Sequence, residues 1–281
     1  MTIHVVAPGE TVSSIAARYG ADPVRLARDN SVPPSGALAV GQTLVLRFPR
    51  QTHSVQQGET LTSIAARYGV TVRRLWRNNF FLGGGELLLP GQTLVISYTE
   101  EPQERITANG YAYPYIPSDL LAQTLPYLST LTPFTYGITV EGTILPLADD
   151  LLLSAARDRG TGTVMHLSTL TEDGSFDTGR AAMVLTDSAL QDRLIDQILQ
   201  TLLSRRYNGL DVDFEFIPGE LAAPYAAFLE RLRSLVHARG LFLWAALAPK
   251  TSAAQRGLLY EGHDYGAVSQ AVDGVLLMTY E

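Results

Sequence analysis

The sequence predicts an α/β protein in which two small α+β repeats precede a (β/α)8 barrel of the TIM-barrel type, with about six of its eight strands present. Two observations predict this fold. A motif recurs near the N-terminus at an offset of 49 to 50 residues, which is typical of tandem structural repeats. From Ile106 onward, apolar strand-like runs alternate with amphipathic stretches, and this alternation favours a parallel sheet flanked by helices.

Each repeat is predicted to form a strand, two helices and a second strand. Gly-Glu-Thr at 9–11 returns at 58–60, and Ile-Ala-Ala-Arg-Tyr-Gly at 15–20 returns at 64–69. The Thr is placed to cap the first helix at its N-terminus, and the Gly after Tyr is placed to end that helix. Gly-Gln-Thr-Leu-Val then begins the closing strand, which we expect to pair with the first.

This pattern resembles the LysM module, whose members bind chains of N-acetylglucosamine such as peptidoglycan and chitin. The resemblance implies a sugar groove between the start of the first helix and the loop after the second. The implied contacts in the first repeat are Gly9, Glu10, Thr11 and Asn30. Those in the second repeat are Gly58, Glu59, Thr60, Asn79 and Phe80. Thr and Asn side chains also cap helices and turns, so a purely structural role stays open for each of them.

Four segments are predicted along the chain. The two repeats cover 1–49 and 50–99. Residues 100–105 are polar, largely acidic and interrupted by proline, which predicts an exposed linker. Residues 106–281 form the barrel region.

Strands and helices alternate throughout the barrel region. The predicted strands cover 106–112, 134–140, 163–168, 209–215, 241–247 and 273–280. The predicted helices cover 118–130, 149–159, 187–206, 224–239 and 264–271. The helix at 187–206 has the clearest i, i+4 leucine and isoleucine stripe, with Thr186 or Asp187 as its cap. Because eight strands close such a barrel and six are counted, we expect a longer protein to contain this chain.

Three carboxylates occupy one predicted strand at alternate positions. Asp211, Asp213 and Glu215 therefore point to one face, which in a barrel is the interior. Carboxylates gathered there repel one another and resist desolvation, so at least one is expected to keep a proton near neutrality and to serve as a general acid. A metal site and a structural role are the alternatives, although the segment supplies no histidine.

The same segment resembles the signature of glycoside hydrolase family 18, Asp-x-x-Asp-x-Asp-x-Glu, with Asn208 in place of the first Asp. Further matches are Gly110-Tyr111, Ala248-Pro249-Lys250 and Met278-Thr279-Tyr280-Glu281. Two LysM modules before such a barrel resemble the branch of bacterial spore cortex-fragment-lytic glucosaminidases.

That resemblance implies a substrate-assisted reaction, an exception to the scheme with two enzyme carboxylates. Glu215 would protonate the glycosidic oxygen while the acetamido carbonyl of the substrate attacks the anomeric carbon. Asp213 would orient the acetamido N–H, Asp211 would adjust the protonation of the three carboxylates, and Tyr280 would donate to the acetamido oxygen. The other implied substrate contacts are Met278, Glu281, Tyr111 and Asn208. Glu281 stands where many members carry Asp.

Composition and charge limit the partners. The 281 residues include no cysteine and five scattered histidines, so we expect no disulfide, no metal site and no cofactor. No apolar run reaches the ~18 residues of a membrane helix, and no signal peptide is visible at the start. Residues 1–105 carry a net charge of +2 and residues 106–281 one of −9, without a basic run, which argues against nucleic acid.

The sequence thus predicts an N-acetylglucosaminidase that hydrolyses peptidoglycan or spore cortex, located in the spore envelope or cell wall and monomeric at full length. A chitinase anchored by LysM modules is the first alternative. A non-catalytic protein that binds N-acetylglucosamine polymers is the second, and the presence of Glu215 argues against it.

Overall fold

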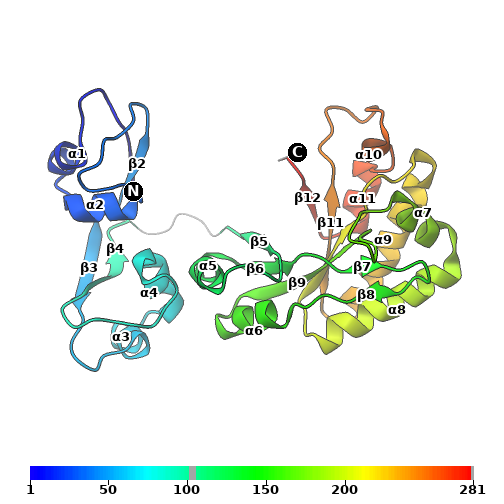
Figure 1. Ribbon diagram of the computed structural model, residues 1–281, viewed down its shortest axis with the longest axis horizontal. Coiled ribbons are helices and arrows are strands. Elements are labelled where there is room, and N and C mark those ends of the chain that lie inside the picture. Colours follow the sequence, from blue (N-terminus) through cyan, green and yellow to red (C-terminus); the bar gives the residue numbers. More distant parts are fainter. Residues whose placement is uncertain (101–105, 280–281) are drawn as a thin grey trace. The chain divides into compact units, whose positions relative to one another are not determined.

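The computed structural model describes residues 1–100 and 106–279, and the chain forms two compact units (Figure 1). The first unit holds both N-terminal repeats together with Pro117–Tyr127. The second unit holds Thr107–Ile116 and the chain from Leu128 onward. Among the described residues, no helix is long and apolar enough to cross a membrane.

Both repeats have the predicted order of strand, helix, helix and strand. The elements of the first are β1 (Thr2–Val5), α1 (Val12–Tyr19), α2 (Pro23–Asp29) and β2 (Thr43–Leu46). Those of the second are β3 (Pro49–Ser54), α3 (Leu61–Tyr68), α4 (Val72–Asn78), the 3-10 turn η1 (Phe80–Leu82) and β4 (Thr93–Tyr98). In each repeat the two strands pair antiparallel.

The first helix of each repeat begins and ends at the residues that the sequence predicts. Thr11 and Thr60 are the N-caps, and each forms a reciprocal capping box with the Ser three residues later. Gly20 and Gly69 end the helices at φ 64°, a left-handed conformation that glycine adopts without strain.

Each repeat has its own small apolar core. The first is built by Val6, Val12, Ile15, Ala16, Leu26, Ala27, Leu44 and Leu46. The second is built by Val55, Leu61, Ile64, Ala65, Leu75, Trp76, Leu94 and Ile96. The equivalent positions of the two copies are buried alike, so the repeats share a single packing scheme.

The second unit is organised around a parallel sheet of six strands. These are β5 (Asn109–Ala112), β6 (Thr130–Pro133), β9 (Gly162–Ser168), β10 (Gly209–Asp213), β11 (Phe242–Leu247) and β12 (Gly274–Leu277). Their spatial order is β12-β11-β10-β9-β6-β5, so strands that are consecutive along the parallel succession are neighbours in the sheet. This arrangement confirms the predicted TIM-barrel class.

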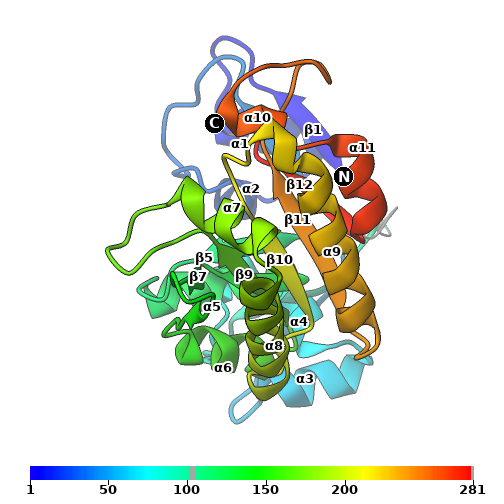
Figure 2. The ribbon, with the colours of Figure 1, turned by 90° about the vertical axis from the view of Figure 1, so that its right-hand side faces the viewer.

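Helices cover the outer face of these strands. The barrel region contains α5 (Ser118–Thr124), η2 (Leu125–Tyr127), α6 (Asp150–Asp158), α7 (Thr178–Thr186), α8 (Ser188–Ser204), η3 (Gly219–Leu221), α9 (Ala222–His237), α10 (Leu258–Glu261) and α11 (Tyr265–Ala271). Figure 2 shows α8, α9 and α11 alongside β10, β11 and β12. Asp187 is the N-cap of α8, and the sequence did not predict α7 or α10.

The strand predicted at 134–140 is wrong. The second strand of the sheet is β6, which ends at Pro133, a residue without an N–H to extend the ladder. After it the chain keeps an isolated parallel bridge from Tyr136 to Leu167 of β9, and a short hairpin forms between β7 (Gly137–Ile138) and β8 (Ile144–Leu145). β-Branched and aromatic residues favour any extended pairing, so composition did not distinguish this hairpin from a barrel strand.

The N-cap of α3 provides a test of this local scheme. Thr60→Ala removes the side-chain oxygen that accepts from the backbone N–H of Ser63, and we expect it to lower the free energy of unfolding by about 0.5–2 kcal/mol. Thr60→Ser should keep the cap. Thr62→Ala, at an exposed position of the same helix, is the matched control. Urea unfolding followed by circular dichroism measures all three, and equal stabilities for Thr60→Ala and the control would contradict the capping role.

Candidate active site

Two buried carboxylates lie on β10 at the centre of the sheet. Asp211 is 0% exposed and Asp213 is 8% exposed. Between them, Val212 points the other way into the helix-packed core, as the alternation of a strand requires. From β5, the Tyr111 hydroxyl donates to Asp211 Oδ2 at 2.5 Å. Tyr111, predicted as a substrate contact, therefore also supports the carboxylate behind the site.

His166 on β9 joins these carboxylates, and sequence reasoning missed it. Parallel pairing sets His166 beside Asp211, with its Nε2 3.4 Å from Asp213 Oδ2 and 3.9 Å from Asp211 Oδ2. Its Nδ1 lies 2.6 Å from Thr135 Oγ1, which fixes the ring. Histidines were weighed only as metal ligands. The sequence did contain a signal for His166. Side chains alternate between the two faces of the strand at 163–168, and this strand neighbours the one that carries the carboxylates.

Glu215 lies two residues beyond the end of β10, and not on the strand as predicted. It nevertheless lines the same cavity as Asp213, and the chain turns directly after it at Phe216, whose φ is 53°. A positive φ is uncommon for a residue with a Cβ and marks a turn that its surroundings must stabilise. The predicted grouping of Asp213 and Glu215 at one end of the strand is therefore present.

An open cavity of about 450 Å³ lies over this end of the strands. Its lining is Tyr111, Ala112, Tyr113, Phe134, His166, Phe176, Asp213, Glu215, Ala246, Leu276 and Met278. The aromatic rings contact one another, with Phe134 stacked on His166 at 4.8 Å and set edge-on to Tyr113 at 5.2 Å. The cavity thus combines an acidic floor with an aromatic wall, a lining suited to a sugar ring with polar substituents.

Burial raises the pKa of Asp211 above its ordinary value, and the charge of Asp213 adds to that rise. The nearby His166 and the hydrogen bond from Tyr111 oppose the rise. Within the described residues, neither Asp211 Oδ1 nor Asp213 Oδ1 has a hydrogen-bond partner, although both atoms are buried. A buried oxygen without a hydrogen-bond partner destabilises the fold unless a ligand donor or a shared proton bonds to it.

The remaining predicted contacts of the barrel lie in different places. Met278, just after β12, lines the cavity. Asn208 does not, and its prediction is corrected: it precedes the first residue of β10, at the opposite end of the strand, where Oδ1 accepts from the backbone N–H of Thr163 at 2.8 Å. Its role is to join two strands. Tyr280 and Glu281 lie outside the described residues.

In both repeats the predicted Glu has buried partners. Glu10 Oε2 lies 2.6 Å from His4 Nε2 and accepts from the backbone N–H of Ala7. Glu59 meets His53 at the same 2.6 Å distance. These contacts hold the pKa of both carboxyls below its ordinary value, the backbone hydrogen bond being the largest cause and the histidine the next. Each Glu therefore ties the turn before the first helix to the first strand.

Asn30 and Asn79 are also structural. Asn79 is 1% exposed, and its amide donates to Leu75 O and Val95 O at 2.9 Å while Oδ1 accepts from the Val95 N–H. Asn30 makes the equivalent three bonds in the first repeat. Both amide hydrogens are used, so the sugar contact predicted for these side chains has no free donor. Sequence position alone did not reveal this pairing with the closing strand.

The other predicted contacts of the repeats lie at the surface. Gly9, Gly58, Thr11 and Thr60 are exposed around the helix starts. Phe80 in η1 is 37% exposed and follows the second helix, where the resemblance places one side of the groove. Of the side chains predicted in the second repeat, Phe80 presents the largest open apolar surface.

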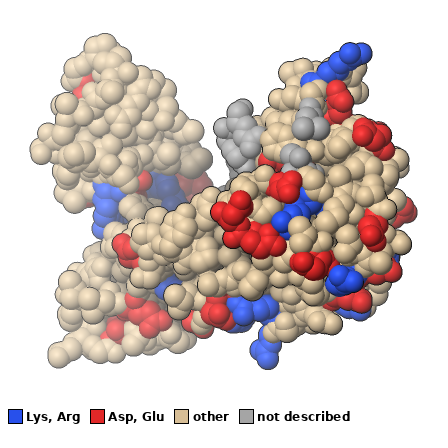
Figure 3. All heavy atoms as spheres, turned by 45° about the vertical axis from the view of Figure 1, so that its right-hand side comes forward, with Lys and Arg blue, Asp and Glu red and all other residues tan. Residues whose placement is uncertain are grey.

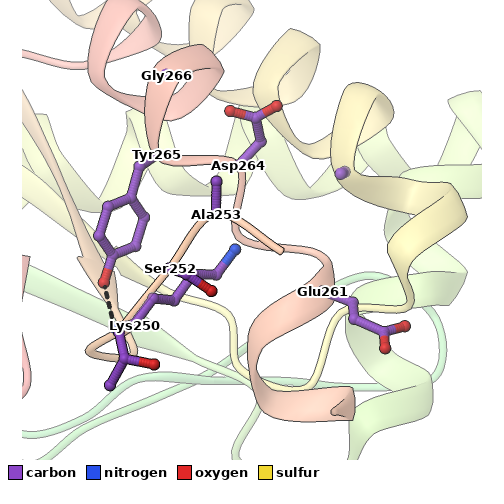
Figure 4. A pocket seen from close by; sticks show the side chains of 9 residues that line it. Lys250, Ser252, Ala253, Glu261, Asp264, Tyr265 and Gly266 are labelled. Atoms are coloured by element: carbon purple, nitrogen blue, oxygen red, sulfur yellow. Dashed lines mark hydrogen bonds between the residues drawn. The ribbon is translucent and has the colours of Figure 1, made fainter. Parts of the chain in front are cut away.

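A second cavity, of about 350 Å³, lies beside the loop that follows β11 (Figure 4). Lys250, Glu261 and Asp264 line it, but each is engaged. Lys250 Nζ donates to a backbone carbonyl at 2.5 Å, and the two carboxylates accept backbone N–H groups at 3.0 Å. Since the β10 carboxylates are not part of its lining, we place the chemistry in the larger cavity.

On the face drawn in Figure 3, acidic side chains are spread over the second unit, and residues 106–281 carry a net charge of −9. Within residues 1–100 and 106–279, no group of three or more His, Asp or Glu side chains is arranged to hold a metal ion.

Comparisons with known proteins identify residues 4–47 and 53–97 as LysM domains. The chain is 37% identical over 289 residues to the cortical fragment-lytic enzyme of Bacillus subtilis (strain 168), covering 100% of this chain and 66% of that protein. It resembles the crystal structure of the spore cortex-lytic enzyme SleL of Bacillus megaterium QM B1551 with a TM-score of 0.74 and 28% identity, covering 99% of this chain and 66% of that one. A class V chitinase of Pseudomonas fluorescens Pf-5 aligns at a TM-score of 0.57 and 26% identity, covering 62% and 54% of the two chains. The chain spans about two thirds of the length of the curated relatives it matches.

The hydrogen bond from Tyr111 to Asp211 gives a prediction for protonation. Tyr111→Phe removes a donor that favours the charged carboxylate, so the pKa of Asp211 should rise further. Because the folded pKa lies above the unfolded value of 3.8, Asp211 destabilises the fold as pH rises through 3.8 toward the folded pKa, and the variant should extend that interval upward. Carboxyl ¹³C NMR titration measures the shift, with Tyr113→Phe as the control. An unchanged or lower Asp211 pKa in Tyr111→Phe would contradict the assignment.

Proposed function

We propose that the protein is a glycoside hydrolase that cleaves N-acetylglucosamine-containing glycan of the spore cortex or of peptidoglycan, with two LysM domains holding it on that polymer. The observation that carries the proposal is the pairing of Asp213 and Glu215 in one aromatic-walled cavity, over the buried Asp211. The likeness to a cortical fragment-lytic enzyme and to a cortex-lytic enzyme over nearly the whole chain supports the substrate class.

The geometry is suited to a substrate-assisted, retaining reaction of the family 18 kind. Glu215, half-buried in the cavity lining beside Asp213, would donate its proton to the glycosidic oxygen as the bond to the anomeric carbon breaks. The acetamido carbonyl oxygen of the same sugar would form the new bond to that carbon, giving an oxazolinium ion. Water would then open this ring, with its proton passing to Glu215.

Asp213 is suited to orient the acetamido group. Its Oδ1 is buried without a partner among the described residues, and an acetamido N–H is a donor that such an oxygen requires. Asp211 lies behind it with a raised pKa, so a proton held there limits the repulsion between the two carboxylates. The role of Tyr280 as a donor to the acetamido oxygen rests on the family resemblance alone.

A chitinase is the second candidate, favoured by the similarity of the second unit to a class V chitinase. The two candidates use the same residues and differ in the polymer. Turnover of muropeptide-bearing cortex fragments against chitin oligomers separates them. For the first candidate, we propose a site of action at the spore cortex or cell wall and a monomeric enzyme.

Replacing the proposed acid tests the mechanism. Glu215→Gln deletes the transferable proton and should lower kcat on cortex fragments by about 10²–10⁴-fold, while binding to insoluble peptidoglycan stays unchanged. Glu220→Gln, an exposed carboxylate on η3, is the matched control. Hydrolysis by Glu215→Gln within tenfold of the unaltered protein would exclude Glu215 as the acid.

Replacing the exposed aromatic residue tests the anchoring. Phe80→Ala should weaken sedimentation with insoluble peptidoglycan about tenfold, a change equivalent to 1.4 kcal/mol of lost contact. Leu87→Ala, at an 81% exposed position of the same repeat, controls for loss of apolar surface alone. If both variants bind as tightly as the unaltered protein, Phe80 does not form part of the sugar groove.

A further inference from the structure

A buried histidine outside the cavity contacts the chain segment that carries Glu215. His263, between α10 and α11, is 0% exposed. Its Nε2 lies 2.8 Å from the carbonyl oxygen of Phe214, and its Nδ1 lies 3.3 Å from the backbone nitrogen of Ala248. Phe214 separates Asp213 from Glu215, so this ring touches the backbone between the two proposed functional carboxylates.

The two partners determine the state of the ring. A carbonyl oxygen only accepts, so Nε2 must carry a hydrogen, and a backbone N–H only donates, so Nδ1 must be bare. His263 is therefore a neutral imidazole in one tautomer. Burial lowers its pKa in agreement with this, although the Phe214 carbonyl and the negative charge of Asp213 favour the protonated form and Lys250 disfavours it.

The residue before His263 packs against the same turn. A Cβ on Gly262 would lie 2.3 Å from the carbonyl oxygen of Ile217, so only glycine permits this approach. Residues 262–263 thus run directly along 214–217. That stretch includes Phe216 at φ 53°, a conformation that a residue with a Cβ keeps only when its neighbours hold it.

The other side of the loop is anchored as well. Tyr265, drawn in Figure 4, donates from its hydroxyl to Ala248 O at 2.5 Å and accepts from the Lys250 N–H at 2.9 Å. Lys250 Nζ in turn donates to His263 O at 2.5 Å. The ring of Phe214 is held separately, by stacking on Tyr225 and Phe228 of α9. These contacts fix the position of His263, and His263 in turn holds the Phe214 carbonyl.

We propose that His263 is a positioning residue for Glu215: its Nε2–H holds the Phe214 carbonyl, and with Gly262 it keeps the turn at 214–217 in the conformation that directs the Glu215 carboxyl into the cavity beside Asp213. The inference rests on the proposed role of Glu215. His263 does not line the cavity and takes no proton from the substrate.

Two substitutions separate the two hydrogen bonds of the ring. His263→Gln places an amide donor near the position of Nε2, and His263→Asn places an acceptor near that of Nδ1 but no donor within reach of Phe214 O. We expect kcat on cortex fragments to fall about 10²-fold in the Asn variant with KM little changed, as for a misplacement of about 1 Å, and to stay within tenfold in the Gln variant. Equal losses in both variants, or none in either, would overturn the proposal.

Hydrogen–deuterium exchange tests, independently of turnover, whether His263 holds the turn at 214–217. Peptides that cover 214–219 should exchange faster in His263→Asn than in His263→Gln or the unaltered protein. In the unaltered protein, ¹⁵N NMR of the imidazole should show the Nε2–H tautomer from pH 5 to pH 8. Equal exchange in the two variants, or a protonated or Nδ1–H ring, would overturn the proposal even if the protein hydrolysed no glycan. Lack of turnover in the unaltered protein with the expected exchange and tautomer would refute the proposed function alone.

Discussion

Two carboxylates buried side by side in a parallel sheet are the constraint on which the site depends. Removing a charge from water costs several kcal/mol unless partners replace the lost hydration. For Asp211 and Asp213 those partners are Tyr111 from β5 and His166 from β9, so the sheet must assemble before the carboxylates are compensated. The compensation is incomplete, since each Asp keeps one buried oxygen without a partner among the described residues. These oxygens without a partner are what allows the cavity to bind a group that donates hydrogen bonds.

In each LysM domain, polar partners likewise compensate a carboxylate. In each repeat a buried His joins a Glu, at 2.6 Å in both copies, and a Tyr hydroxyl, at 3.2 Å from His4 and 3.0 Å from His53. The Glu also accepts a backbone N–H from the turn before the first helix. Because the whole arrangement recurs with the repeat, the Gly-Glu-Thr motif is explained by folding of that turn. In the proposed function, glycan contacts fall to exposed positions around it.

In the proposed function the two units serve one polymer. LysM domains that hold a glycan raise the local concentration of further glycan for a site on the same chain, so weak binding at each module suffices. The catalytic cavity then needs to recognise little more than one acetamido sugar and its neighbour. Its lining agrees with this division, since the wall is aromatic and the charged groups are confined to the floor.

Sequence reasoning identified features that are set by neighbours along the chain: the capped helices of both repeats, the leucine-striped α8, and the shared face of Asp211 and Asp213. Strand alternation and capping are local, so a short window determines them. Tertiary structure alone decided the rest. Tyr111 meets Asp211 across 100 residues, His166 meets both carboxylates from a neighbouring strand, and Asn208 joins two strands away from the cavity. These outcomes depend on the order and register of the sheet, which no single segment of the sequence specifies.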